Sequence, residues 1–240
     1  MRYLMTFSYD GTNFYGYQKQ PKLRTIEGEL EDALTFINDG KEVIVHSSGR
    51  TDRKVHAINQ KAHFDLDKDI SLYKLKSALN TYTGKDIYVK DIEVVDDNFH
   101  ARYMVKKKIY IYKINVGEYN PIDRNYVFQY NKPLDINTMN NQIKYLIGTH
   151  DFSSFANMED KKESYVRTIY DAYIESNNNI ITIIFIGDGF LKYQVRNMVG
   201  CLIETSTKNR NIKEILDKKN RCSYGKIAPP EGLYLYDVDY

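Results

Sequence analysis

Two kinds of apolar periodicity alternate along this chain, and their order limits the folds that it can adopt. Alternation with a period of two, typical of strands, runs over residues 3–9, 62–66 and 87–95. Between these segments, apolar residues recur at helical spacing over residues 26–37 and 72–79. This order of elements, which is strand, helix, strands, helix and strand, predicts a split β-α-β unit for the first half of the chain.

Local signals indicate where these elements begin and end. Thr25 and Ser71 are good N-cap residues for the two helices, and Gly40 closes the first. The short apolar run at residues 43–45 predicts a further strand, which leads into the polar segment at residues 48–57.

The second half has a similar mixture of patterns. Strand-like alternation over residues 109–116 places Tyr110 and Tyr112 on one face. The other elements predicted here are a helix capped by Asp135, bearing Met139 to Ile147 and closed by Gly148, a hairpin of strands 167–174 and 180–186 around Asn177 to Asn179, a helix over 191–203 and a strand over 233–238.

Length and composition fit a folded protein with two domains. A chain of 240 residues can form one large or two small domains, and we predict two, at residues 1–105 and 106–240. Charged residues make up 28% and hydrophobic residues 42% of the chain, which excludes a disordered protein. Because the net charge is only +2, any attraction to nucleic acid has to come from a local basic groove.

Cysteine and histidine spacing gives no sign of a metal site. Neither Cys201 nor Cys222 lies in a cluster with zinc-ligand spacing, and Cys201 fits a buried position in a helix. His56, His63 and His100 lack ligand spacing as well. With no signal-peptide pattern and no apolar run long enough to cross a bilayer, a cytoplasmic protein without membrane contact is expected.

The segment around Asp52 is the strongest candidate for chemistry. One carboxylate lies there among three cations, Arg50, Arg53 and Lys54. Nearby opposite charges favour the ionised carboxylate, which makes Asp52 a possible nucleophile rather than a general acid. The alternative is a solvated polar turn in which Asp52 caps the next element.

Several further segments occur in one order along the chain. They are Tyr9–Thr12 with Phe14–Gln18, Gly49–Asp52 with Val55–Ala57, Phe99–Arg102, Tyr110, Val195–Gly200 and Glu231–Leu235. Together they resemble the TruA-type tRNA pseudouridine synthases, over essentially the whole chain.

Two positions depart from that family's pattern. Lys54 replaces its usual glycine and Tyr17 its usual tryptophan, and because only glycine reaches positive φ easily, we expect the loop to follow a different path or fit a different RNA contour.

The resemblance implies an α+β fold of two ferredoxin-like (RRM-like) halves whose antiparallel sheets join, with helices on one face and a central cleft. It also implies isomerisation of uridine to pseudouridine in the anticodon stem-loop of tRNA, at tRNA positions 38–40, by a homodimer that needs no cofactor and no metal. The same chemistry on another RNA, such as rRNA, remains an alternative. A protein of this fold that binds RNA without modifying it is the other, but binding alone does not need a carboxylate that repels phosphate.

The family's site residues transfer to five positions of this chain. Asp52 is implied to be catalytic, and attack at C1′ of the sugar, attack at C6 of the base and glycal formation all stay open as routes. Arg50 is expected to enter the base stack or to hold phosphate. Tyr110 is expected to stack on the extruded uracil, Arg196 to pair with Asp52, and Leu233 to line the uracil pocket.

Two basic runs are candidates for binding the tRNA backbone. They are Arg53 and Lys54, and Lys106, Lys107 and Lys108. Such runs are most often solvated faces, but two of them along one cleft would form a track for phosphates.

Overall fold

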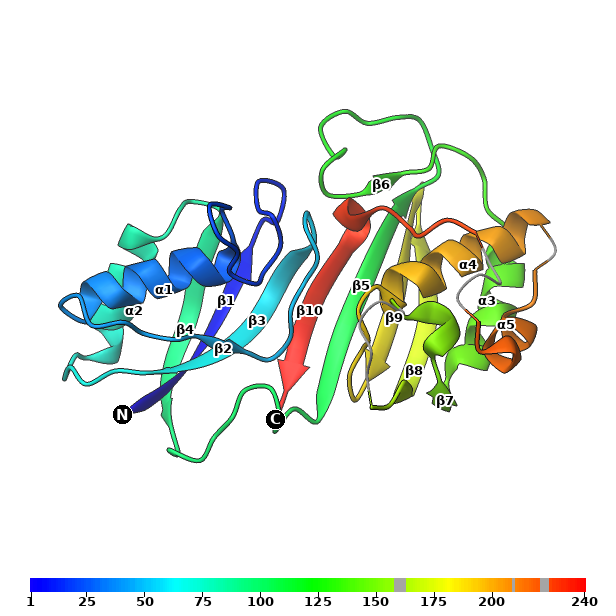
Figure 1. Cartoon of the computed structure of the whole chain (residues 1–240). Helices are drawn as coiled ribbons and strands as arrows, with labels where there is room; N and C mark the ends of the chain where they lie inside the picture. The colour runs from blue at the N-terminus through cyan, green and yellow to red at the C-terminus, as the bar shows by residue number, and fades with distance from the viewer. Residues whose placement is uncertain (158–162, 209, 221–224) are drawn as a thin grey trace. The chain divides into compact units, whose positions relative to one another are not determined.

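The computed structural model describes the chain as two compact units. The described residues are 1–157, 163–208, 210–220 and 225–240, so Cys222 lies outside them. The first unit comprises residues 1–106 and 234–240, and the second comprises residues 107–233. The chain therefore leaves the first unit, builds the second and returns to the first. Both units mix helices with mostly antiparallel strands (Figure 1).

The first unit is a sheet with two helices packed on one face (Figure 1). Its elements are β1 (Arg2–Tyr9), α1 (Ile26–Ile37), β2 (His46–Ser47), β3 (His56–Asp65), α2 (Leu72–Tyr82), β4 (Ile87–Val95) and β10 (Leu233–Asp239), whose first residue is counted with the second unit. The strand order is β4-β1-β3-β10, with β2 paired to β3. All pairs in this unit are antiparallel except β10 with β3, which is parallel.

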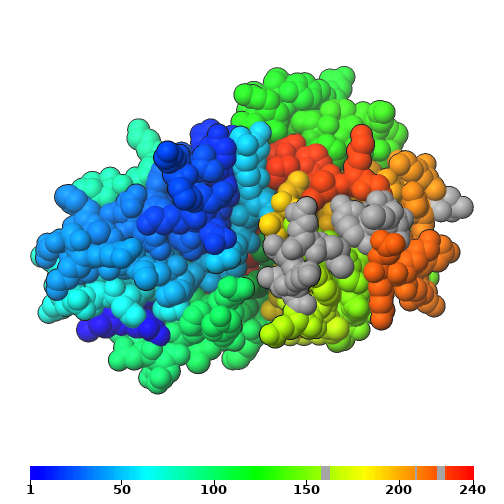
Figure 2. Space-filling model, viewed as in Figure 1, coloured from blue at the N-terminus to red at the C-terminus, as the bar shows by residue number. Residues whose placement is uncertain are grey.

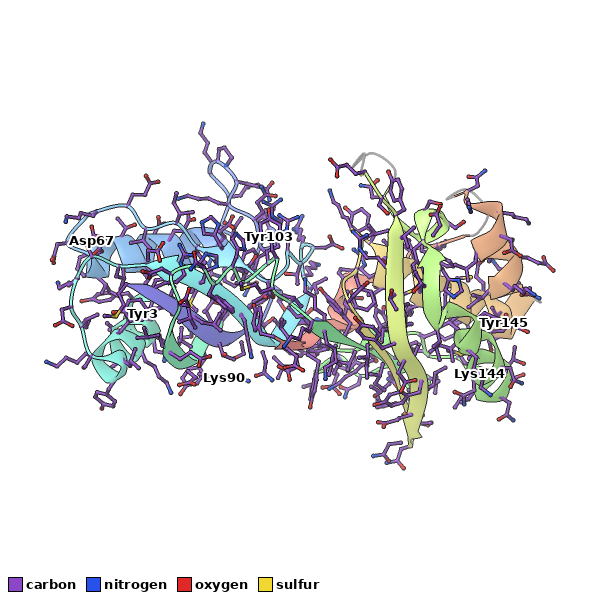
Figure 3. The ribbon with its side chains drawn as sticks, turned by 90° about the horizontal axis from the view of Figure 1, so that it is seen from below. Tyr3, Asp67, Lys90, Tyr103, Lys144 and Tyr145 are labelled. Atoms are coloured by element: carbon purple, nitrogen blue, oxygen red, sulfur yellow. The ribbon has the colours of Figure 1, made fainter. Side chains whose placement is uncertain are left out.

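The predicted N-caps and apolar faces of the first unit are confirmed, whereas the first helix ends at Ile37 with Asn38 as its C-cap, before the predicted Gly40. The Thr25 hydroxyl accepts a hydrogen bond from the Gly28 N–H over 3.3 Å, and Ser71 caps α2 in the same way. Leu30 and Leu34 of α1 are fully buried, as helical spacing requires. Figure 3 draws the side chains of this unit, with Tyr3 on β1 and Lys90 on β4 labelled.

The strand predicted at residues 43–45 is wrong, and the first strand after α1 is β2. Val43 and Val45 are buried, but their backbone N–H groups do not pair with a strand. The Val43 N–H donates to Thr35 Oγ1 and the Val45 N–H to Glu31 Oε1, each over 3.2 Å. Side chains of α1 thus satisfy this backbone, which removes the need for a ladder partner.

The second unit is a sheet covered by three helices that pack on one another (Figure 1). Its elements are β5 (Lys107–Asn115), β6 (Phe128–Gln129), α3 (Ile136–Ile143), η1 (Lys144–Leu146), β7 (Gly148–Asp151), η2 (Ser153–Phe155), β8 (Val166–Asn177), β9 (Ile180–Gly187), α4 (Gln194–Lys208), α5 (Ile212–Lys218) and η4 (Pro230–Gly232). The strand order is β5-β9-β8-β7, with β6 paired to β5.

The predicted hairpin of the second unit is confirmed as β8 and β9, with Asn178 at positive φ in its turn. Asp135 caps α3 as predicted, but α3 ends at Ile143 rather than at Gly148. The chain tightens there into the 3₁₀ turn η1, marked in Figure 3 by the labelled Lys144 and Tyr145. The sequence reading also missed β6, β7 and α5, which are short elements with weak periodicity.

Candidate active site

The loop that carries Asp52 runs from Ser48 to Val55, between β2 and β3. Its first residues are fixed to β3 by Gln60, which is fully buried. The Gln60 side chain donates to the carbonyl oxygen of Gly49 over 2.9 Å and accepts from the Ser48 hydroxyl over 2.6 Å. Asp52 itself is half-buried.

The segment after β1 holds the middle of the Asp52 loop. The Tyr17 N–H donates to the carbonyl oxygen of Thr51 over 3.1 Å, and the Tyr9 hydroxyl lies 2.7 Å from Thr51 Oγ1. Gly16, at a φ of +98°, comes so close that a Cβ atom there would lie 3.3 Å from both Thr51 O and Arg53 N. In Figure 2 the dark-blue residues after β1 lie directly beside this loop.

The end of the loop is fixed by Gly11 and His56. A Cβ atom on Gly11 would overlap with the carbonyl oxygen of Val55, so only glycine fits at this contact. The Gly11 N–H donates to Nδ1 of His56 over 3.1 Å. The His56 ring is buried and stacks on Tyr234 of β10, with 4.8 Å between the ring centroids.

Asp52 begins a tight turn that contains an unusual backbone conformation. The Val55 N–H donates to the carbonyl oxygen of Asp52 over 3.1 Å, and Lys54 has a φ of +66°. The sequence predicts that a lysine in place of glycine changes the path of the loop or the RNA contour that it fits, and Lys54 adopts the left-handed conformation. This conformation costs a residue other than glycine about 1 kcal/mol.

The three cations around Asp52 are all exposed. Arg50 precedes Asp52 by two residues, and Lys54 follows it by two. The Arg53 guanidinium lies over the ring of Tyr15, with Cζ 4.4 Å from the ring centroid. The side chain of Arg53, the residue after Asp52, therefore has a defined position over the Tyr15 ring.

Tyr110 lies on β5 and is only 8% exposed. It faces the same way as Tyr112, and its ring meets Phe190 edge-on with centroids 5.1 Å apart. The Tyr112 ring is fully buried and its hydroxyl donates to the carbonyl oxygen of Pro229 over 2.8 Å. Tyr110 and Tyr112 thus lie on the same face of β5, and both are buried.

Arg196 lies in the first turn of α4 and is held by the chain that follows α5. Its Nε donates to the carbonyl oxygen of Ala228 over 2.8 Å, and the Ala228 N–H donates back to the Arg196 carbonyl oxygen over 3.1 Å. Its guanidinium also lies 5.5 Å from the ring of Tyr193, which has a strained φ of +67°. Leu233, at the start of β10, is buried.

The lysine run is divided between two environments. Lys106 is exposed, and its N–H donates to the carbonyl oxygen of Asp239 over 2.9 Å. Lys107 and Lys108 begin β5 and are half-buried. Successive strand residues point to opposite faces, so Lys107 and Lys108 do not present their charges on one face.

Three histidines gather in the first unit, although they are far apart in sequence. The ring centroids of His46 and His63 are 4.8 Å apart, and those of His63 and His100 are 4.7 Å apart. Nδ1 of His63 accepts from the Ala101 N–H over 3.1 Å, which requires an unprotonated nitrogen. Burial and then the two neighbouring histidines lower the pKa of His63 to about 4.

Neither a metal cluster nor a membrane span is found in the part of the chain that the structure describes. Cys201 is buried in α4 as predicted, and burial raises the pKa of its thiol to about 12.

Sequence reasoning missed some residues that shape these sites. Tyr15, Gly16 and His56 belong to the motifs that carried the family resemblance, but their contacts with the Asp52 loop were not foreseen. The contact of Tyr193 with Arg196 depends on a backbone conformation that no residue type signals.

Comparison with known proteins gives matches over both units. A sequence profile of a family described as tRNA pseudouridine synthase matches residues 5–104 and 143–240. A tRNA pseudouridine synthase A of Anoxybacillus flavithermus is 44% identical over 238 residues, which cover 98% of this chain and 97% of the relative. One of Streptococcus uberis is 42% identical over 245 residues, which cover 100% of this chain and 98% of the relative.

Proposed function

The chain belongs to the tRNA pseudouridine synthase family and isomerises uridine to pseudouridine in tRNA, and from this premise we propose that Asp52 is the nucleophile and that the anticodon stem-loop is the substrate. The reaction breaks the glycosidic C–N bond, rotates the uracil and joins it again through carbon. An ionised carboxylate serves each of the three routes, at C1′, at C6 of the base or through a glycal.

The observation that carries this proposal is the fixation of the Asp52 loop on three sides. Gln60 holds its start, Tyr17 holds Thr51, and Gly11 closes on Val55. A catalytic group has to be held close to its productive geometry, and a solvated surface turn needs no such support. This support favours the enzyme over the polar-turn alternative.

The remaining roles are proposed from the family pattern. The target uridine is extruded from the stack at a cost of about a few kcal/mol, and Arg50 takes its place or holds the phosphate. Tyr110 stacks on the extruded uracil, Arg196 pairs with Asp52, and Leu233 lines the pocket. The near-complete burial of Tyr110 suits a ring that presents one edge or face to a base.

We propose that the first unit supplies the carboxylate of Asp52 and that the second unit supplies Tyr110, Arg196 and Leu233. Both units are proposed to be ferredoxin-like, which the β4-β1-β3 order with β2 against β3 supports in the first. Five cations are proposed to meet tRNA phosphates, namely Arg53, Lys54, Lys106, Lys107 and Lys108. The enzyme is proposed to act in the cytoplasm as a homodimer.

A release assay on tRNA labelled with tritium at C5 of uridine tests the role of Asp52. Asp52→Asn keeps the shape of the side chain but removes the nucleophile, so turnover should fall by several orders of magnitude while RNA binding persists. Asp65→Asn, on β3 and remote from the loop in sequence, is the matched control and should keep turnover. Substantial tritium release by Asp52→Asn would refute the assignment.

Mapping pseudouridines in total RNA from cells with and without this protein tests the substrate. We expect that cells without the protein lose pseudouridines only in the anticodon arm of tRNA. Loss of sites only in rRNA would support the alternative that the same chemistry acts on another RNA.

A further inference from the structure

Tyr15 and Arg53 form a pair beside the nucleophile that the proposed roles do not explain. Tyr15 is 43% exposed, although its neighbours Phe14 and Gly16 are buried. The Arg53 guanidinium covers its ring with Cζ 4.4 Å from the centroid. An exposed contact of this kind is weak, so an incoming ligand can displace or extend it easily.

The backbone of Tyr15 is held firmly while its ring faces outward. Its N–H donates to the carbonyl oxygen of Arg24 over 2.9 Å, and its own carbonyl oxygen accepts from the Gln20 side chain over 3.0 Å. The next residue, Gly16, lies against the backbone of Thr51 and Arg53. The ring is thus presented at a fixed position relative to the Asp52 loop.

A second arginine over an aromatic ring in the same unit shows what a purely structural pair looks like. Arg24 lies over Phe14 with Cζ 4.1 Å from the centroid, but Phe14 is buried and Arg24 is held by the carboxylates of Asp86 and Glu29. Tyr15 is exposed instead, and Arg53 is in none of the ion pairs found among the described residues. The Tyr15–Arg53 pair therefore keeps its planar surfaces available.

We propose, resting on the function above, that Tyr15 and Arg53 form a stacking platform for an RNA base next to the target uridine. Extruding a base leaves its neighbours without one stacking partner. Aromatic rings and guanidinium planes are the surfaces on which proteins stack unpaired RNA bases. Because Arg53 directly follows Asp52, with about 3.8 Å between their Cα atoms, the platform lies within reach of an adjacent nucleotide. Every base has a flat face, so the platform accepts any base.

Binding of the intact protein to unmodified tRNA, measured against salt, tests the role of Tyr15. Tyr15→Leu should weaken binding by about 5- to 150-fold, the usual effect of losing one stacked base, and should leave the salt slope unchanged because no phosphate contact is lost. Tyr15→Phe should bind like the parent. Tyr73→Leu is the matched control, since Tyr73 is 83% exposed on α2, and it should have no effect.

Arg53→Lys separates a platform from a simple phosphate contact. Lysine keeps the charge but has no plane, so a platform predicts weaker binding with the parent's salt slope. Parent-like binding by Arg53→Lys, with a flatter salt slope in Arg53→Gln, would assign Arg53 to phosphate alone and overturn its stacking role.

A fluorescent base analogue gives the direct readout. 2-Aminopurine placed next to the modified uridine should be quenched by the parent and by Tyr15→Phe, but not by Tyr15→Leu. If Tyr15→Leu binds, quenches and turns over like the parent, the platform does not exist. If the parent itself converts no uridine in tRNA, the proposed function fails, whereas loss of binding in Tyr15→Leu would still report the stacking surface.

Discussion

The backbone N–H of Tyr17 donates a hydrogen bond to the carbonyl oxygen of Thr51 over 3.1 Å, and so joins the segment after β1 to the residue before Asp52. These two residues are far apart in sequence, yet this bond and the adjacent Gly16 contact hold the backbone of the Asp52 loop at Thr51 and Arg53. The loop is thus positioned by its neighbours rather than by its own sequence.

Gly16→Ala should therefore impair catalysis more than folding. A Cβ atom there would press on Thr51 O and Arg53 N at 3.3 Å, and the φ of +98° adds strain of about 1 kcal/mol. Gly40→Ala is the matched control, because Gly40 has a φ of +85° but nothing within 4 Å of its Cβ position. Both variants should lose similar stability in thermal melts, and only Gly16→Ala should lose kcat. Equal turnover in the two would show that the Gly16 contact does not position the loop.

Lys54→Gly should stabilise the protein relative to Lys54→Ala. Both variants remove the same charge, but only glycine relieves the strain at a φ of +66°, by about 1 kcal/mol. Denaturant unfolding of the two variants measures the difference. Equal stabilities would mean that the positive φ at Lys54 carries no strain.

The same two variants test the phosphate contact of Lys54. If Lys54 binds a phosphate, each should flatten the dependence of log Kd on log salt by up to about 0.7–0.9 and change turnover at saturating tRNA much less. An unchanged slope together with a changed set of modified uridines would make Lys54 a determinant of loop shape instead.

Stability should fall as the pH drops from about 6.5 towards 4, because of His63. The folded pKa of about 4 lies below the ordinary value of 6.5, so the unfolded chain binds this proton first. Its contribution is complete above pH 6.5 and is lost as the pH falls through that window, with a slope of up to about 1.4 kcal/mol per pH unit. The charged and titratable groups that act on it are His46, His100, Arg2 and Asp65.

His63→Gln supplies the control for this window. The glutamine carbonyl can accept the Ala101 N–H without titrating, so the variant should be less stable at pH 7 but show a flatter profile between pH 5 and 6.5. If the stability of the variant and of the parent changed with pH in parallel, another group would cause the acid sensitivity.

Tyr17→Phe should stabilise the protein by about 1 kcal/mol, whereas Tyr9→Phe should destabilise it by a similar amount. Tyr17 is fully buried, and burial together with Glu27 raises the pKa of its hydroxyl well above the usual value. Ser47 opposes this shift slightly, but within the described residues the Tyr17 hydroxyl has no partner with hydrogen-bond geometry. The Tyr9 hydroxyl is bonded to Thr51. Thermal melts in which both variants shift the melting temperature in the same direction would contradict this contrast.

The sequence predicts those parts of the fold that depend on local chemistry. Thr25 and Asp135 cap helices because a side-chain oxygen meets an N–H only a few residues away. Residues 43–45 were misread because their partners, Thr35 and Glu31, lie on α1, and apolar runs do not show which group will bond their backbone.

For the candidate site, motif order leads to Asp52 and its neighbours, but it does not give the contacts that hold them. The bond from Tyr17 to Thr51 and the fit of Gly11 against Val55 join segments that are distant in sequence. A single sequence does not show which distant segments come into contact. The positive φ of Lys54 was missed because tertiary contacts impose it against the preference of the residue.

The return of residues 234–240 to the first unit has a consequence for synthesis on the ribosome. Strand β3, which follows the Asp52 loop, pairs with β10, and Tyr234 covers His56. Until translation has passed the whole second unit, a delay of roughly ten seconds, that side of β3 has no β10 partner and can pair with another nascent chain. The Asp52 loop therefore acquires its final support among the last events of folding, after the second unit has been translated.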